Sequence, residues 1–181
     1  MIGRRQLLLA GGGALAGLLL SDIRRSRAAA VDIHMRSDRD GARVGFDPVG
    51  LLIEPGATVR WVCDANVHSV SAYHPDNDGH SLRIPETAAP WASDYLQSGQ
   101  EFAVTLTVPG AYDYYCTPHE AAGMVGRIIV GRPGGPATLP FDYFVAQGRH
   151  WLLVPVEAQR AFPAIATILA RRIIPSPVAF G

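Results

Sequence analysis

The sequence contains no lysine and only two cysteines, Cys63 and Cys116, in 181 residues. Two cysteines can form at most one disulfide, which excludes the small disulfide-rich scaffolds of many secreted proteins. Hydrophobic residues make up 48% of the chain, and a domain of ordinary size can fold on such a core without covalent crosslinks. The length allows one such domain plus additional segments.

The chain also lacks a surplus of basic charge. Its 16 arginines balance 16 acidic residues, and residues 31–181 carry 11 arginines against 15 acidic residues. A mildly acidic body without a basic stripe offers no electrostatic footprint for a polyanion. We therefore expect no nucleic-acid partner.

The N-terminal segment is apolar but too short for a comfortable membrane span. Arg4 and Arg5 precede the apolar stretch Leu7–Leu20, and this segment resembles a twin-arginine export signal. Ala28–Ala30 offers a small-residue cleavage site, although its distance from the apolar stretch is long, so an uncleaved anchor is the alternative. In both cases residues 1–30 direct the body out of the cytoplasm, and we expect a periplasmic or otherwise extracytoplasmic location.

From residue 43 onward the hydrophobic pattern is that of β-strands. In Ala57–Cys63, alternation places Val59, Trp61 and Cys63 on one face. The other expected strands are Val49–Ile53, Val67–Tyr73, Phe102–Val108, Ala111–Cys116 and Val125–Val130. Short strands broken by Pro-Gly turns, with no amphipathic helix between them, predict an all-β fold, an antiparallel sandwich or barrel. We expect residues 74–99 to be irregular.

A thiol, an imidazole and a thioether lie close together where one expected strand ends. His119 is three residues after Cys116 and Met124 is eight residues after it, while His68 lies in an upstream strand. One cysteine, two histidines and a distant methionine suit a trigonal copper site with a long axial bond, the arrangement used for electron transfer. We therefore predict that His68, Cys116, His119 and Met124 bind one copper ion.

Each of these residues also has a simpler interpretation. In an exported protein Cys116 could form a disulfide with Cys63, although alternation turns Cys63 to the Trp61 face as a small buried hydrophobe. His68 and His119 could be ordinary hydrogen-bonded histidines, and a methionine often fills a core. The complete set at this spacing, after an alternating strand, favours the metal site.

Val108–His119, continued by Gly123–Gly126, resembles the signature of small blue (type 1) copper proteins of the plastocyanin and pseudoazurin group. The match covers about residues 41–131 and includes Phe46–Pro48, Glu54–Gly56 and His68–Val70. The resemblance implies a Greek-key β-sandwich, the cupredoxin fold, for a domain at residues 31–131, with the same four copper ligands. Ser69 stands where the family often has asparagine, which puts in question one contact between the two ligand loops.

The resemblance also implies a function, an electron carrier rather than an enzyme, with its copper cycling between the +1 and +2 states. A multicopper oxidase needs histidines on both sides of the ligating cysteine, where this chain has Tyr115 and Thr117. We expect transient redox partner proteins to dock where the His119 ring edge approaches solvent. Copper storage or delivery is the alternative, and a metal-free interaction module of the same fold is a third possibility.

The other histidines in the body of the chain do not suggest a second metal site. Asp76–Gly79 lies between His74 and His80 but lacks the later acidic ligand of a calcium loop, so it is interpreted as a polar turn. His34 and His150 are weaker candidates as well, and we expect no second metal. Tyr112, Tyr114 and Tyr115 are interpreted as sheet packing, although Tyr114 shares the strand face of Cys116, which places it near the site.

The segment 132–181 follows a Pro-Gly-rich linker and is the least readable part of the chain. A helix is expected at 156–174, kinked by Pro163. Its apolar stretch Ala161–Ala170 is too short to cross a membrane. We expect this extension to lie on the sandwich or cover a sheet edge, and the alternative is docking to a membrane redox complex.

Overall fold

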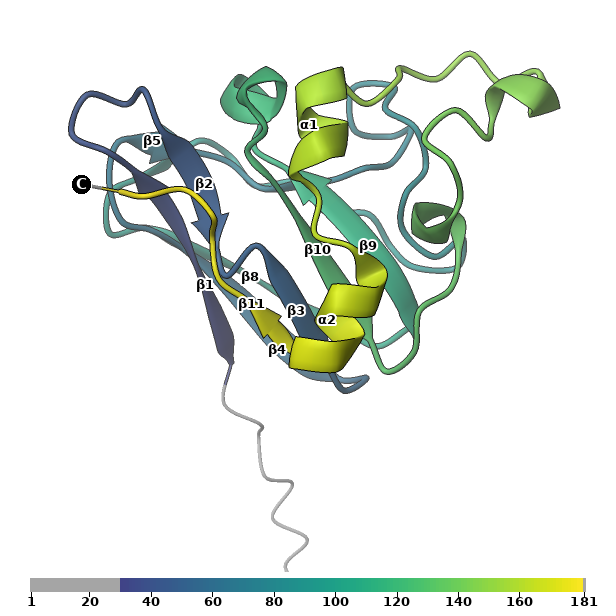
Figure 1. Cartoon of the computed structure of the whole chain (residues 1–181), viewed down its shortest axis with the longest axis horizontal. Helices are drawn as coiled ribbons and strands as arrows, with labels where there is room; N and C mark the ends of the chain where they lie inside the picture. Colours follow the sequence, from purple (N-terminus) through teal and green to yellow (C-terminus); the bar gives the residue numbers. More distant parts are fainter. Residues whose placement is uncertain (1–29, 181) are drawn as a thin grey trace, which may run out of the picture.

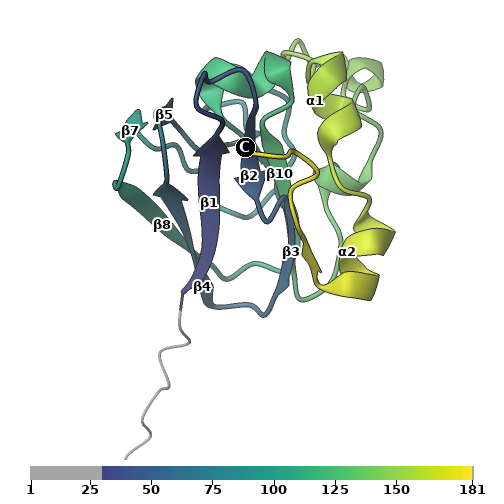
Figure 2. The same ribbon diagram turned by 60° about the vertical axis from the view of Figure 1, so that its left-hand side comes forward.

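The computed structural model describes residues 30–180, and the chain forms two β-sheets packed face to face (Figures 1 and 2). The predicted export signal or anchor at residues 1–30 therefore lies almost wholly outside the described residues. None of the helices in the described part has the length and apolar composition needed to cross a membrane. The predicted all-β sandwich is confirmed.

The first sheet has the strand order β2-β1-β4-β8, and the second has the order β11-β3-β10-β9-β6. The strands of the first sheet are β1 Val31–Ser37, β2 Val44–Asp47, β4 Ala57–Cys63 and β8 Glu101–Leu106. Those of the second are β3 Gly50–Ile53, β6 Ser71–Ala72, β9 Gly110–Tyr115, β10 Val125–Val130 and β11 Ile173–Ile174. A separate two-stranded ribbon consists of β5 Val67–His68 and β7 Leu96–Gln97.

The core between the sheets is built by alternation, as the sequence predicted for β4. Val59, Trp61 and Cys63 are all fully buried. The Trp61 ring meets the Tyr114 ring edge-on, with ring centroids 5.4 Å apart. Tyr114 lies directly over Gly126, where a Cβ atom would collide with the phenol. Glycine at this position thus lets the tyrosine fill the core beside Cys116.

The sequence indicated an antiparallel sandwich, and the structure differs from this in two strand pairs. β1 pairs with β4 in parallel, and β3 pairs with β10 in parallel, whereas the other pairs are antiparallel. The two strands of each parallel pair are not consecutive in the chain. The chain passes through the other sheet between them, so both strands can run in the same direction. The strand β1 also begins at residue 31, upstream of the point where the β pattern was expected to start.

The expected single strand Val67–Tyr73 is divided between two sheets. β5 pairs with β7 in the ribbon, and β6 pairs with β9 in the second sheet. His68 ends β5, so the break directly follows the first candidate ligand. Alternation alone could not locate this break, because the side chains on both sides of it are buried.

The C-terminal extension folds back over the outer face of the second sheet (Figure 2). Instead of one kinked helix at 156–174, it forms α1 Val156–Ala161 and α2 Ile165–Arg171. Pro163 separates the two helices, because proline cannot donate the backbone hydrogen bond that a continuous helix requires. β11 then adds antiparallel to β3. The extension therefore covers both a sheet face and a sheet edge, and its docking to a membrane complex stays a prediction.

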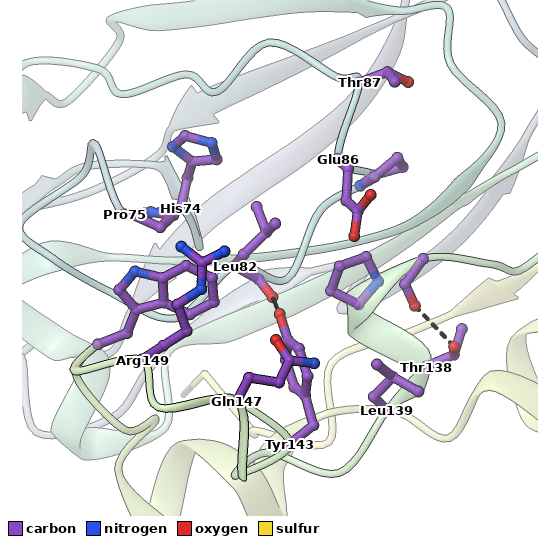
Figure 3. Close-up of a pocket in the computed structure, with 14 residues that line it drawn as sticks. His74, Pro75, Leu82, Glu86, Thr87, Thr138, Leu139, Tyr143, Gln147 and Arg149 are labelled. Atoms are coloured by element: carbon purple, nitrogen blue, oxygen red, sulfur yellow. Dashed lines mark hydrogen bonds between the residues drawn. The ribbon is translucent and has the colours of Figure 1, made fainter. Parts of the chain in front are cut away.

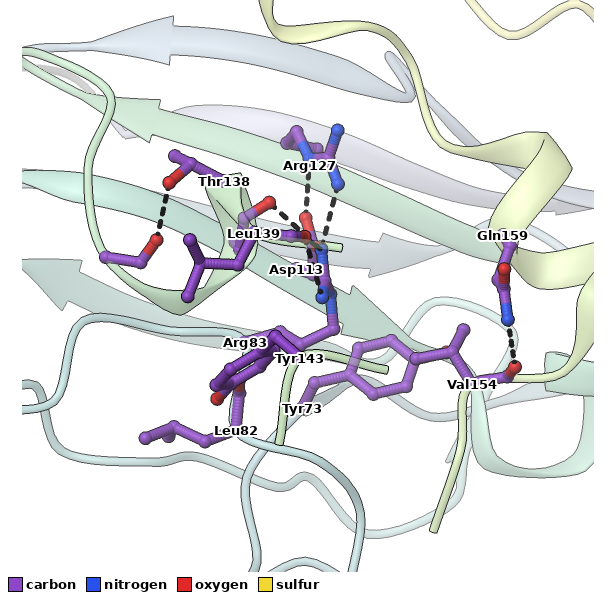
Figure 4. Close-up of polar contacts among 12 residues, drawn as sticks. Tyr73, Leu82, Arg83, Asp113, Arg127, Thr138, Leu139, Tyr143, Val154 and Gln159 are labelled. Carbon is purple, nitrogen blue, oxygen red and sulfur yellow. Dashed lines mark hydrogen bonds and ion pairs between the residues drawn. The ribbon is translucent and has the colours of Figure 1, made fainter. Parts of the chain in front are cut away.

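One buried carboxylate holds this extension in place (Figure 4). Asp113, on the outer face of β9, accepts hydrogen bonds from Arg83 Nε at 2.8 Å and from Arg127 Nε at 2.6 Å. Arg83 also donates to the carbonyl of Ala137 at 3.0 Å, and Arg127 donates to that of Pro163 at 3.0 Å. Both carbonyls belong to the extension, so the two arginines connect it to the sandwich.

Asp113→Asn should therefore destabilise the whole domain. The substitution leaves two buried guanidinium groups without their anion, and breaking such a pair costs about 3–5 kcal/mol. Chemical unfolding of the metal-free protein measures this change in the free energy of unfolding. Asp142→Asn, at an exposed position, is the matched control and should change stability by less than about 0.5 kcal/mol. Equal stability of the two variants would contradict the structural role of Asp113.

Candidate metal centre

The four predicted ligands meet at one end of the sandwich. Cys116 directly follows β9, His119 lies in the 3-10 helix η1 (Thr117–Ala122), and Met124 precedes β10. The loop closes on itself, because the Cys116 amide donates to the Met124 carbonyl at 3.0 Å and the Met124 amide donates to the His119 carbonyl at 3.1 Å. His68 arrives from β5. Three ligands thus come from one short loop, and the fourth comes from a distant part of the chain.

The side chains point their donor atoms toward a common centre. Cys116 Sγ lies 3.4 Å from Nδ1 of His119 and 3.7 Å from Nδ1 of His68. Within residues 30–180, these three residues form the single group of histidine, cysteine or acidic side chains whose ligand atoms all lie within 4.8 Å of one another. Met124 is fully buried in the same core cluster as Cys116. The structure therefore brings together the predicted set.

Burial sets the protonation of this site. It lowers the pKa of His68 to about 4, with His119 acting in the same direction, and it also lowers the pKa of His119. Burial raises the pKa of the Cys116 thiol to about 11. At neutral pH both imidazoles are thus neutral and offer lone pairs, while the thiol must lose its proton when a metal enters.

Ser69 joins the two ligand segments. Its backbone amide donates to Cys116 Sγ at 3.3 Å, and its hydroxyl oxygen accepts a hydrogen bond from the Thr117 amide at 2.9 Å. The serine therefore makes the contact that was in question because the related family often has asparagine here. A hydrogen bond to the sulfur also stabilises its negative charge when a metal is bound.

Cys63 is not a disulfide partner of Cys116, since both cysteines are free. Its side chain is fully buried, as predicted from the alternation of β4. The Cys63 sulfur lies 3.4 Å from the Leu96 carbonyl oxygen and 3.6 Å from that of Ala65. It packs beneath the segment that carries His68.

A second polar network, which the sequence did not predict, braces η1 from the other side. Glu120 accepts a hydrogen bond from the Tyr73 hydroxyl at 2.6 Å and lies 3.1 Å from His80 Nε2. The His80 ring stacks on Tyr115, with centroids 4.4 Å apart. These residues come from two distant stretches, residues 73–80 and 115–120, so spacing along the chain gave no signal beyond the adjacency of Glu120 to His119.

The extension contacts the ligand loop as well. A Cβ atom placed on Gly123, which has a φ of 82°, would lie 3.3 Å from the Ala161 Cβ atom of α1. Figure 1 shows α1 beside the helical turn that follows β9. Glycine here therefore permits both the left-handed turn after η1 and the close approach of the helix.

A surface groove of about 880 Å³ lies elsewhere (Figure 3). It is lined by parts of the 74–99 segment and of the extension, and Tyr143 donates to the Leu82 carbonyl at 2.8 Å within it. Arg149 packs over the Trp151 ring at 5.3 Å. The groove shares no residue with the candidate metal centre, and we assign it no role in the chemistry there.

The donor set fits copper. Thiolate, two imidazoles and a thioether satisfy the preference of monovalent copper for sulfur and that of divalent copper for nitrogen. No carboxylate belongs to the group of ligand atoms in the described residues, so the site does not suit a hard cation such as calcium. The buried position excludes bulk water from the donors His68, Cys116 and Met124.

Comparisons with known proteins agree with this assignment. A family model described as copper binding proteins, plastocyanin/azurin family, matches residues 33–131. The chain is 32% identical over 118 residues to plastocyanin of Chlamydomonas reinhardtii, covering 65% of this chain and 79% of that protein. It is 30% identical over 118 residues to pseudoazurin of Paracoccus pantotrophus, covering 65% and 74%.

Solved structures show the same likeness. A pseudoazurin from Sinorhizobium meliloti superposes with a TM-score of 0.53 at 28% identity, covering 73% of this chain and 89% of that one. Pseudoazurin from Methylobacterium extorquens AM1 gives a TM-score of 0.50 at 21% identity, covering 78% and 98%, and supports the fold alone. The predicted cupredoxin fold is confirmed.

The His80–Glu120 contact should make stability depend on pH. Burial lowers the pKa of His80, but hydrogen bonds to Glu120 and Asn77 outweigh it, so the pKa lies above its ordinary value of 6.5. The ion pair therefore stabilises the fold fully below pH 6.5, and this contribution is lost as the pH rises through the folded pKa. The difference in the free energy of unfolding between metal-free wild type and His80→Gln should therefore become smaller as the pH rises from 6.5 through the folded pKa of His80.

The matched control for this experiment is His150→Gln, at an exposed position. Its stability relative to wild type should show no such decrease. A His80→Gln difference that stays constant from about pH 5 to about pH 9 would mean that the charge on His80 does not contribute.

Proposed function

Because the chain belongs to the plastocyanin/azurin family of copper-binding proteins, we propose that it is an exported carrier of single electrons. One observation carries this proposal. Two imidazoles, a thiol and a thioether converge in a buried site of which one ligand, His119, is not fully buried. Such a site can exchange electrons with a partner but leaves little room for a substrate.

The copper ion, when bound, supplies the one-electron couple. The protein residues hold the donor atoms in one arrangement that suits neither oxidation state fully, so little rearrangement is needed in each transfer. Ser69 ties the Cys116 sulfur to the β5–β6 segment, and Glu120 ties η1 to Tyr73 and His80. The two β-sheets below keep these connections stiff.

The electron path leads through His119. His68, Cys116 and Met124 are completely shielded from solvent, whereas His119 is partly exposed. Its neighbours in the loop include the small or apolar residues Pro118, Ala121, Ala122 and Gly123, which are exposed or partly exposed. A neutral rim of this kind favours brief contact with a redox partner, since desolvation costs little and no ion pair must be broken on release.

The residues beside the ligating cysteine argue against oxygen chemistry. Tyr115 is buried and stacks on His80, and Thr117 uses its amide to bind Ser69. Neither can supply the imidazoles that a neighbouring multinuclear copper centre needs. The proposed role is therefore electron transfer without catalysis.

Purified protein should bind one copper ion per chain and show an intense visible absorption band from thiolate-to-copper charge transfer. Cys116→Ser should remove the band, because the serine oxygen cannot replace the covalent bond to sulfur. Met124→Leu should keep the colour and shift the reduction potential, because the axial contact is weak. Optical and paramagnetic spectra with metal analysis measure these changes, and a full band in the Cys116→Ser protein would reject the assignment.

The same protein distinguishes electron transfer from copper storage or delivery. A carrier should cycle reversibly between the coloured and colourless forms and retain its metal against a chelator of monovalent copper. A delivery protein should bind colourless monovalent copper and release it readily. The burial of three ligands favours retention.

Export by the twin-arginine route is part of the proposal. Replacing Arg4 and Arg5 by lysine keeps the charge but removes the guanidinium pair, so the full-length protein should remain in the cytoplasm. Arg24→Lys with Arg25→Lys is the matched control, and its export should be unchanged. Cell fractionation measures both, and export of the Arg4 and Arg5 variant at the normal level would argue for another route.

A further inference from the structure

The buried ring of His68 makes a contact on the side away from the other ligands. Its Nδ1 atom faces Cys116 Sγ, and its Nε2 atom lies 2.7 Å from the Ser37 hydroxyl oxygen. Ser37 is the last residue of β1, a strand that contributes no metal ligand. This hydrogen bond thus connects the first sheet directly to the metal centre.

The geometry decides which atom donates. A metal at the common centre would take the Nδ1 lone pair of His68, so the neutral ring must carry its proton on Nε2. Nε2–H then donates to Ser37 Oγ, its one hydrogen-bond partner among the described residues. His68 is fully inaccessible to solvent in this structure, so the Ser37 hydroxyl and not water is the acceptor for Nε2.

The position of Ser37 does not depend on its own side chain. Its backbone pairs with Val44 in the ladder between β1 and β2. Ile33 and Met35, two and four residues earlier on the same face, are fully buried in the core. The serine continues this row at the point where the row reaches the metal centre. His68 is the one hydrogen-bond partner of its hydroxyl among the described residues.

We infer that Ser37 is a positioning residue for copper: its hydroxyl oxygen fixes the ring plane and tautomer of His68 and thereby lowers the reduction potential of the site. An acceptor at Nε2 increases the electron density of the imidazole, which strengthens its bond to divalent copper more than to monovalent copper. The inference rests on the proposed function, because it concerns the same metal centre.

The test compares copper-loaded Ser37→Ala, Ser37→Thr and wild type. Ser37→Ala should raise the reduction potential, whereas Ser37→Thr, which keeps the hydroxyl, should restore it toward the wild-type value. Ser98→Ala is the matched control, because Ser98 is exposed and its hydroxyl bonds the Asp64 carbonyl away from the ligands. A potential for Ser37→Ala equal to that of the control would overturn the inference.

A second measurement does not depend on a variant that folds. In wild-type protein loaded with monovalent copper, nitrogen-15 NMR should show a proton on Nε2 of His68 that exchanges slowly with solvent. Exchange at the rate of a free imidazole would overturn the inference. If wild-type protein binds no copper at all, the proposed function fails; copper binding with an unchanged potential in Ser37→Ala refutes only the role of Ser37.

Discussion

Two hydrogen bonds from a single serine hold the metal centre together. The Ser69 amide donates a hydrogen bond to the Cys116 sulfur, 47 residues later, and the Ser69 hydroxyl accepts one from the Thr117 amide, 48 residues later. The two ligand segments are therefore held at a fixed distance from each other. The positions of His68 and of the Cys116–Met124 loop relative to each other follow from this connection. Burial raises the pKa of the Cys116 thiol, and the Ser69 amide opposes this effect, so without the amide the thiolate form would be disfavoured further.

The rest of the molecule supports that connection from three directions. Ser37 reaches the His68 ring from the first sheet, and Tyr73 and His80 hold Glu120 next to His119. The extension approaches the same loop through α1 and is itself bound to the sandwich by Arg83 and Arg127, the two partners of Asp113. The additional segments of this chain thus support the ligand loop, while His119 itself stays partly exposed.

Alternation predicted the strands best where one face is buried and the other is partly exposed. β4 has this pattern, and its buried face was identified correctly. Alternation predicted strand boundaries less well where both faces are covered. The segment Val67–Tyr73 was predicted as one strand because its break occurs among buried residues. Pairing direction was also out of reach, because a strand carries the same side-chain period in parallel and antiparallel sheets.

By itself, the sequence determined the chemical nature of the site. Cys116, His119 and Met124 lie in one short loop. Because few residues separate them, their donor atoms stay close together whatever the rest of the fold is. Only the tertiary structure decided which groups complete and tune that site. Ser37 and His80 lie far in sequence from the residues that they contact, His68 and Glu120. These contacts form only when the two sheets and the 74–99 segment pack together. Such long-range contacts depend on the whole packed fold, so no local pattern encodes them.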